Sequence, residues 1–171
     1  FLSDDGSSGT TEYFRVDGGL TKVVVNKSFT FEDNIQAQFG SSADLRLYHN
    51  GTNSNIENFT GTLQIIQNLD DGDISFRSDD GSGGTTEYFR LDGDLGYSVA
   101  SKHILLDDNV KLRVGSSADL EIFHDATDSI INNDVGHLYI TQKADDKDII
   151  FRSDDGSGGV AEYFRLDGGD V

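Results

Sequence analysis

Acidic loops recur along the chain and are the first residues whose type and spacing could do chemistry. The loop at residues 78–84 reads Ser-Asp-Asp-Gly-Ser-Gly-Gly, with Asp79 and Asp80 side by side. Further copies of this acidic pair are Asp4 and Asp5, and Asp154 and Asp155. Ca²⁺ binds several carboxylate and carbonyl oxygens on a flexible loop, but the D-x-D-x-D-G-x₅-E spacing of an EF-hand is missing. A polar turn, with Asp bonded to the backbone and Gly at positive φ, is the favoured interpretation. No metal-binding residue or cofactor is assigned, and calcium at these turns stays the alternative.

A glutamate precedes Tyr-Phe-Arg in every copy of a second motif. The copies are Glu12, Glu87 and Glu162, followed three residues later by Arg15, Arg90 and Arg165. Paired carboxylates can carry out glycoside hydrolysis, but every unit repeats the same acid, whereas a catalytic site is normally built once. The favoured interpretation is a Glu–Arg pair across or between chains, which Arg77 and Arg152 can join. No catalytic residue is assigned, and we expect a protein that is not an enzyme.

Two histidines and three aromatic pairs also recur. His49 and His124 are equivalent, and His124 shares a strand face with Leu120 and Ile122. Three symmetry copies of one imidazole could bind a metal ion, but a strand-end His bonded to a carbonyl is favoured. The two side chains of each Tyr-Phe pair point to opposite faces of their strand. We therefore expect one ring to be buried and the other to be exposed or in contact with another chain. The pairs are Tyr13 and Phe14, Tyr88 and Phe89, and Tyr163 and Phe164.

These candidates recur because one unit of 75 residues is repeated without a gap. The block FRSDDGSGGTTEYFRLDG begins at Phe76 and matches the block at Phe1 in 15 of 18 residues and the block at Phe151 in 16 of 18. A second block begins at Gly40 and again at Gly115, with Ala126 in place of Gly51, which leaves the turn type there open. The predicted units are residues 1–75, 76–150 and the start of a third at 151–171. A gapless repeat is typical of a stack or fibre, because each unit contacts its neighbours in the same way.

Composition narrows the class of protein. The formal net charge is −18, which argues against nucleic acid and anionic lipid surfaces as partners. Leu, Ile, Val and Phe make up 47 of 171 residues, enough for a folded chain. There is no Cys, and therefore no disulfide framework. With no Met and with Phe1 inside a repeat, we expect a piece of a longer protein, and no membrane-spanning stretch is evident.

Short stretches that alternate apolar and polar residues predict an all-β fold. The alternating apolar pairs are Leu45 and Leu47, Leu120 and Ile122, Leu63 and Ile65, Leu138 and Ile140, Ile74 and Phe76, and Phe29 and Phe31, with Val110, Leu112 and Val114 as a triplet. Turn residues separate these stretches at roughly 8–12-residue spacing, which predicts six or seven strands per unit.

A thin single-chain sheet of such short strands buries little apolar surface. Its apolar face therefore needs further apolar surface to pack against. Two arrangements supply that surface: an intertwined homotrimeric β-helix or β-prism, and a single-chain β-solenoid. We favour the homotrimer, because a one-chain solenoid usually shows a shorter rung repeat than this one.

The stretch GSSADLEIFHDATDSIINN, with GHLYITQKADDKDIIFRSDDGSGGVAEYFRLDGG after it, resembles repeat modules of tail-fibre and related virion structural proteins of marine tailed bacteriophages. The resemblance implies a homotrimeric fibrous β-structure on the virion exterior. The expected function is that of a shaft segment that positions a host-binding tip, with other virion proteins as further partners. The alternatives are an acidic calcium-binding extracellular β-solenoid, acting as an adhesin or surface-layer module, and a glycan-binding or glycan-cleaving fibre domain.

Overall fold

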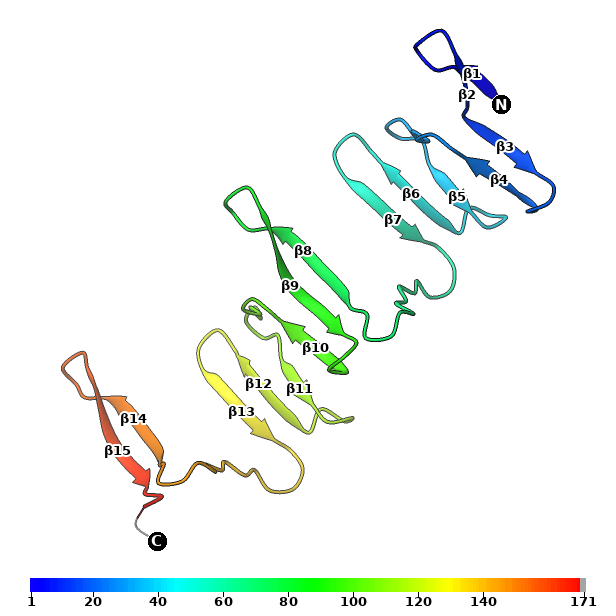
Figure 1. Ribbon diagram of the computed structural model, residues 1–171. Coiled ribbons are helices and arrows are strands. Elements are labelled where there is room, and N and C mark those ends of the chain that lie inside the picture. Colours follow the sequence, from blue (N-terminus) through cyan, green and yellow to red (C-terminus); the bar gives the residue numbers. More distant parts are fainter. Residues whose placement is uncertain (170–171) are drawn as a thin grey trace. The chain divides into compact units, whose positions relative to one another are not determined.

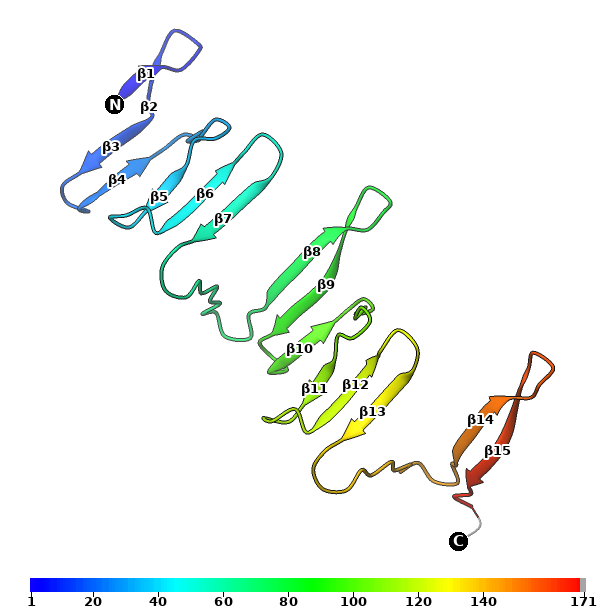
Figure 2. The same ribbon diagram turned by 180° about the vertical axis from the view of Figure 1, so that it is seen from behind.

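The computed structural model describes residues 1–169, and within them every regular element is a β-strand (Figure 1). Fifteen strands form six small open sheets of two or three strands. The ladders are antiparallel and join strands that follow one another closely in the sequence, as both views of the ribbon show (Figure 2). The prediction of an all-β fold is confirmed, and so is the number of strands expected per repeat.

The chain divides into two compact units, Phe1–Ile74 and Ser75–Val171. The first unit contains β1 (Leu2–Asp4), β2 (Thr10–Glu12), β3 (Phe14–Asp17), β4 (Lys22–Val25), β5 (Ala37–Phe39), β6 (Leu45–His49) and β7 (Ser54–Asn58). Its sheets are β1-β2, β3-β4 and β5-β6-β7.

The second unit repeats this plan. Its strands are β8 (Ile74–Asp79), β9 (Thr85–Asp92), β10 (Tyr97–Ala100), β11 (Leu112–Val114), β12 (Leu120–His124), β13 (Ser129–Asn133), β14 (Ile149–Asp154) and β15 (Val160–Leu166). Its sheets are β10-β9-β8, β11-β12-β13 and β14-β15.

Strand register puts the alternating apolar residues on one face of each three-stranded sheet. In the first unit Leu47 of β6 lies opposite Ile56 of β7. In the second unit Ile122 of β12 lies opposite both Leu112 of β11 and Ile131 of β13. Residues two apart on a strand share a face, so the predicted faces of β6 and β12 are confirmed.

Tight turns with positive φ recur at equivalent positions. Gly51 has φ of 88° and Ala126, its counterpart, has φ of 78°. The backbone therefore takes the same turn in both copies, which answers the question left by the Gly-to-Ala difference. Ala43 and Ala118, with φ of 55° and 58°, match in the same way. Since an L-residue pays a steric penalty there, these turns are retained by the ladders on either side of them.

Three predicted strands are wrong. The stretch around Phe29 and Phe31 has no strand, and the stretches at 62–68 and 137–143, with Leu63, Ile65, Leu138 and Ile140, are extended but belong to no sheet in the described residues. Alternation reports which side chains share a face and does not require a pairing strand in the same chain.

The described residues contain no buried hydrophobic side chain, and only Asp92 and Glu121 are buried. The whole chain exposes 13992 Å². Two separately folded domains of the sizes of these units would together expose about 10,000 Å². Some 4,000 Å² that a globular protein would cover is therefore left exposed, and it includes the apolar face of each three-stranded sheet.

The turn at Gly51 and Ala126 generates a matched pair of tests. We expect Ala126→Gly to raise the free energy of unfolding by about 1 kcal/mol, because glycine takes positive φ without the Cβ penalty. Gly51→Ala should lower it by a similar amount, since a Cβ there meets only the Asp33 carboxylate at 3.6 Å, an ordinary contact. Urea unfolding measures both. Equal effects of the same sign would contradict the shared turn.

Candidate functional site

The sheet β11-β12-β13 has one polar face, and its centre is a charged cluster. The Glu121 carboxylate accepts hydrogen bonds from Lys111 Nζ at 2.5 Å and from Arg113 Nε at 3.0 Å. Lys111 Nζ also lies 4.3 Å from the centroid of the Phe123 ring. The hydrogen bond from the Lys111 ammonium is the largest of the effects that lower the pKa of Glu121, and the Arg113 charge acts in the same direction. Burial opposes them, but the pKa of Glu121 stays below its ordinary value. This buried carboxylate is fully paired within the chain.

The equivalent face in the first unit has other charges. Arg46 stands where Glu121 does, and its guanidinium lies 4.3 Å from the centroid of the Phe59 ring. Tyr48 donates a hydrogen bond to Glu57 at 2.8 Å, and this bond raises the pKa of Tyr48. The sequence interpretation missed these clusters. The sequence contains a signal for the charged cluster. At the equivalent positions of the next repeat Glu121 replaces Arg46, and Lys111 and Arg113 replace Gln36 and Gln38.

The apolar faces of the sheets β5-β6-β7 and β11-β12-β13 are exposed to a similar degree in the two units. Ile131 is 59% exposed and its counterpart Ile56 is 61% exposed. Leu112 and Ile122 lie beside Ile131 on the same face and are also exposed. The two units therefore share an uncovered apolar face and differ on the polar one.

The predicted Glu–Arg pair is present in all three copies of its motif, but it forms within one strand or at one strand junction. Arg90 Nη1 donates to Glu87 at 2.7 Å, and Arg90 Nη2 lies 2.8 Å from Asp92. In β15 the register shifts so that Arg152 faces Glu162 while Phe151 faces Phe164. This bulge places residues three apart on one face, so the expectation of a pair across or between chains is wrong. Arg77 instead donates to the Thr85 carbonyl.

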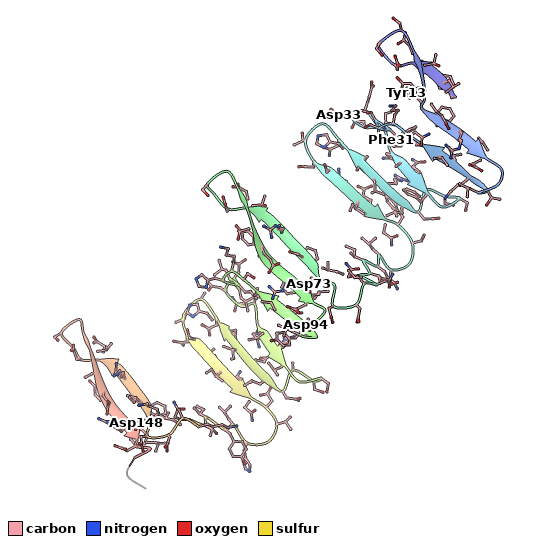
Figure 3. The ribbon with its side chains drawn as sticks, viewed as in Figure 1. Tyr13, Phe31, Asp33, Asp73, Asp94 and Asp148 are labelled. Atoms are coloured by element: carbon pink, nitrogen blue, oxygen red, sulfur yellow. The ribbon has the colours of Figure 1, made fainter. Side chains whose placement is uncertain are left out.

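Electrostatics at this cluster oppose general acid catalysis. Arg90, and then Ser75, hold the pKa of Glu87 below its ordinary value. The Leu95 backbone amide, and then Arg90, lower the pKa of Asp92. A glycosidase needs one carboxyl group whose pKa is raised, and both of these shifts have the opposite sign. In the third copy Arg165 pairs with Glu162 and with Asp148, which lies at the base of the β14–β15 hairpin (Figure 3).

The acidic loops have the geometry of polar turns. Asp80 Oδ1 accepts hydrogen bonds from the backbone and hydroxyl of Ser82 and from the Gly84 backbone, at 2.7–3.1 Å. The Ser82 hydroxyl is the largest of the effects that lower the pKa of Asp80. Gly81 and Gly83 have φ of 80° and 88°. In each copy a tyrosine hydroxyl donates at 3.0 Å to the first loop carbonyl, as Tyr88 does to Asp79. Within residues 1–169 no group of three or more acidic or imidazole side chains is arranged to hold a metal ion.

The two histidines sit at strand ends, as expected, but with another partner. His124 Nδ1 lies 3.3 Å from the Ser129 hydroxyl, and His49 Nδ1 lies 3.3 Å from that of Ser54. The expected carbonyl partner is wrong, because the register places a serine directly opposite each histidine.

The aromatic pairs do not divide into one buried and one exposed ring. Tyr88 and Phe89 are both exposed, and so are the rings of the other two pairs. Phe89 instead contacts Phe76 across the hairpin, with ring centroids 5.9 Å apart, and Phe1 with Phe14 and Phe151 with Phe164 repeat the contact at 5.4 and 5.5 Å. The expectation of one buried ring is wrong for residues 1–169, because no second layer of these residues covers the sheet. Contact of a ring with another chain stays a prediction.

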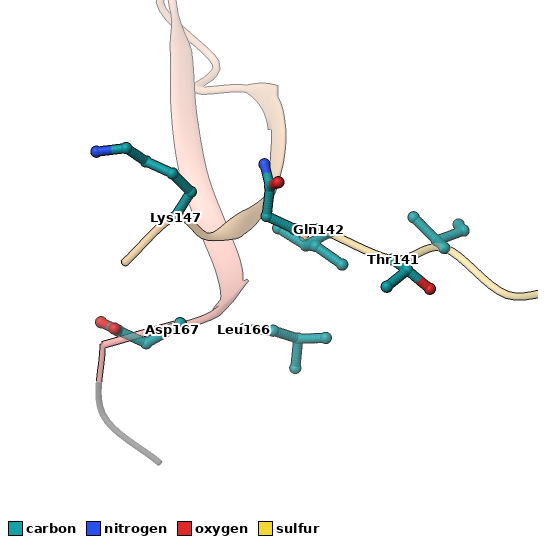
Figure 4. Close-up of a pocket in the computed structure, with 8 residues that line it drawn as sticks. Thr141, Gln142, Lys147, Leu166 and Asp167 are labelled. Carbon is teal, nitrogen blue, oxygen red and sulfur yellow. The ribbon is translucent and has the colours of Figure 1, made fainter. Parts of the chain in front are cut away.

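A small pocket lies where the stretch after β13 approaches the foot of β14 and β15 (Figure 4). It has a volume of about 220 Å³, below the roughly 300–1,000 Å³ of small-molecule sites. The lining residues are Ile140, Thr141, Gln142, Lys147, Ile149, Leu166, Asp167 and Gly168. Its size and mixed lining give no reason to assign a ligand.

Arg90 provides a pH-dependent test. Arg90→Met should lower the urea midpoint at pH 7. The pKa values of Glu87 and Asp92 are lower in the folded protein than in the unfolded chain. The stabilisation that these two ionised carboxylates provide is therefore complete above their unfolded-state pKa values, and it is lost as the pH falls through their folded-state pKa values. The difference from wild type should therefore shrink below about pH 4. Unfolding at pH 7, 5 and 3 measures it, with Lys27→Met as control. A difference that persists unchanged at pH 3 would contradict the pairing.

Chelation tests the calcium alternative. We expect the same melting temperature in EDTA and in millimolar calcium, because the Asp80 oxygen is already occupied by donors from its own loop. A rise of several degrees with calcium, abolished by Asp80→Asn, would instead establish a calcium site.

Comparisons with known proteins do not supply a relative. No helix in the described residues is long and apolar enough to cross a membrane. No family model, curated protein or solved structure matches the chain.

Proposed function

We propose that this chain is a structural shaft segment of a bacteriophage tail fibre or similar virion appendage. In this proposal copies of the chain associate as a homotrimer on the virion exterior and hold a host-binding tip away from the particle. The role is mechanical, with no catalytic step, and the partners are the other copies and further virion proteins.

The uncovered apolar faces are the observation that carries the proposal. No hydrophobic side chain in residues 1–169 is buried, although burial of apolar surface is the main force that stabilises folded chains. The excess exposed area of about 4,000 Å² falls within the range of roughly 2,000–5,000 Å² typical of obligate interfaces. Association of identical chains covers these faces at every repeat, because the same faces recur at the same interval.

The separation of equivalent strands favours several chains over a one-chain solenoid. In a solenoid, equivalent strands of successive repeats stack on one another. Within the second unit the hairpins β8–β9 and β14–β15 are equivalent in sequence, yet they belong to separate sheets. Within the described residues the β8 edge of the first hairpin and both edges of the second are thus left for strands of other chains.

The gapless 75-residue repeat supports a shaft in particular. Equivalent turns and the Glu–Arg pair of the motif recur from one unit to the next, so added units would extend the assembly by equal steps. The acidic charge of −18 favours solubility of such an appendage.

A charged residue introduced on the apolar face tests the proposed association of copies. Wild type should sediment at about three times the chain's 18.6 kDa. Ile131→Glu should raise the dissociation constant at least about tenfold, since the new carboxylate must be desolvated at the interface. The control is Thr127→Glu, at an exposed turn of the same sheet, which should leave the mass unchanged. A wild-type protein that stays monomeric would support the calcium-binding solenoid instead.

Electron microscopy of proteins with different numbers of repeat units tests the proposed shaft role. Proteins with two and with four repeat units should form rods of equal width in negative stain, with length proportional to the number of units. Rounded particles at both lengths would contradict a shaft.

A further inference from the structure

Two extended stretches lack main-chain partners although they are equivalent in the two repeats. Residues 62–68 and 137–143 form no backbone–backbone hydrogen bond with any part of residues 1–169. Both stretches run without a helix, turn or bend and are exposed along their length. Water can satisfy their donors and acceptors in the single chain, but any surface that covers them must supply hydrogen-bond partners.

Both stretches are fixed at their ends in the same way. The Asn58 amide donates to the carbonyls of Thr60 and Gly61, and Asn133 does the same one repeat later. At the other end Gln67 accepts from the backbone of Leu69, and Gln142 accepts from that of Ala144. Side chains therefore hold the two ends, while the main chain between them is open.

Composition gives these stretches the character of strands that another chain can approach. Leu63 with Ile65, and Leu138 with Ile140, alternate at period two, and Ile140 is 63% exposed. No Asp, Glu, Lys or Arg occurs from 58 to 69 or from 135 to 142. In a chain of net charge −18, these are places where copies can meet without like-charge repulsion.

We propose that residues 62–68 and 137–143 are donated β-strands, each of which pairs with the free edge of a sheet in a neighbouring copy of this chain. The inference rests on the self-association in the proposed function and names the segments that join the copies through the backbone. Main-chain pairing supplies affinity in such strand addition, while alternate side chains supply specificity.

A second copy is the occupant that the repeat favours. The two stretches are 75 residues apart, and free sheet edges such as those of β7 and β13 recur at the same interval. Each repeat unit therefore carries one such stretch and one such edge, so a second copy of the chain offers one edge for every stretch. Exposed edges of this kind are templates for pairing with another chain.

Amide hydrogen exchange of the assembled protein tests the inference. At least every second amide in 137–143 should exchange about 100-fold more slowly than in a free chain, since successive amides of a strand point in opposite directions. A homotrimer in which all these amides exchange at free-chain rates would overturn the inference and leave the proposed function standing. A monomer would overturn both.

Proline variants separate the backbone from the side chains. Tyr139→Pro and Ile140→Pro each remove one amide donor, on opposite sides of the strand, while Tyr139→Ala and Ile140→Ala keep it. At least one proline variant should raise the dissociation constant tenfold more than its alanine control. Because neither amide has a partner within the described chain, the monomer should keep its strand content by circular dichroism. Equal effects of proline and alanine at both positions would overturn the inference.

Discussion

Uncovered apolar faces are the constraint on which the rest of this structure depends. A strand with alternating residues always presents one apolar face, and a sheet of three short strands cannot fold over to cover it. Here that face recurs with Leu47 and Ile122 on its central strands, and no apolar side chain of the described residues becomes buried. Fixing one residue of backbone costs roughly 1–2 kcal/mol, and ordering of this extent is normally offset by apolar burial. This missing burial is the physical reason for proposing that further copies of the chain cover these faces.

The polar faces are organised in the opposite way, because each is satisfied within its own sheet. Glu121 is paired with Lys111 and Arg113, and Arg90 binds the carboxylates of Glu87 and Asp92. Such clusters hold the local twist and register of a sheet without help from a partner. The charges at positions 46 and 121 are of opposite sign while the apolar faces match, so the two repeats share the apolar face and differ on the polar one.

Sequence reasoning located the strands that pair within the chain and misplaced those that do not. Alternation at Leu45 and Leu47 became β6, whereas the same pattern at Leu138 and Ile140 lies in an unpaired stretch. Periodicity records which side chains share a face, and nothing in it says which chain supplies the neighbouring strand. The Glu–Arg pair was expected for the right residues, but its geometry came from a bulge beside Arg152, which shifts register by one residue and leaves no periodic trace.

The sequence by itself determined the 75-residue period, the all-β class and the polar turns of the acidic loops, because these follow from local chemistry. The tertiary structure was needed to show that Gly51 and Ala126 take the same positive-φ turn although the residue differs. Only the tertiary structure decided which apolar residues are left uncovered and which carboxylates are paired. Those outcomes depend on the register of the ladders between neighbouring strands, and on how few strands each sheet contains. The recurrent acidic loops are therefore polar hairpin turns, and the uncovered apolar residues lie on the sheets between them.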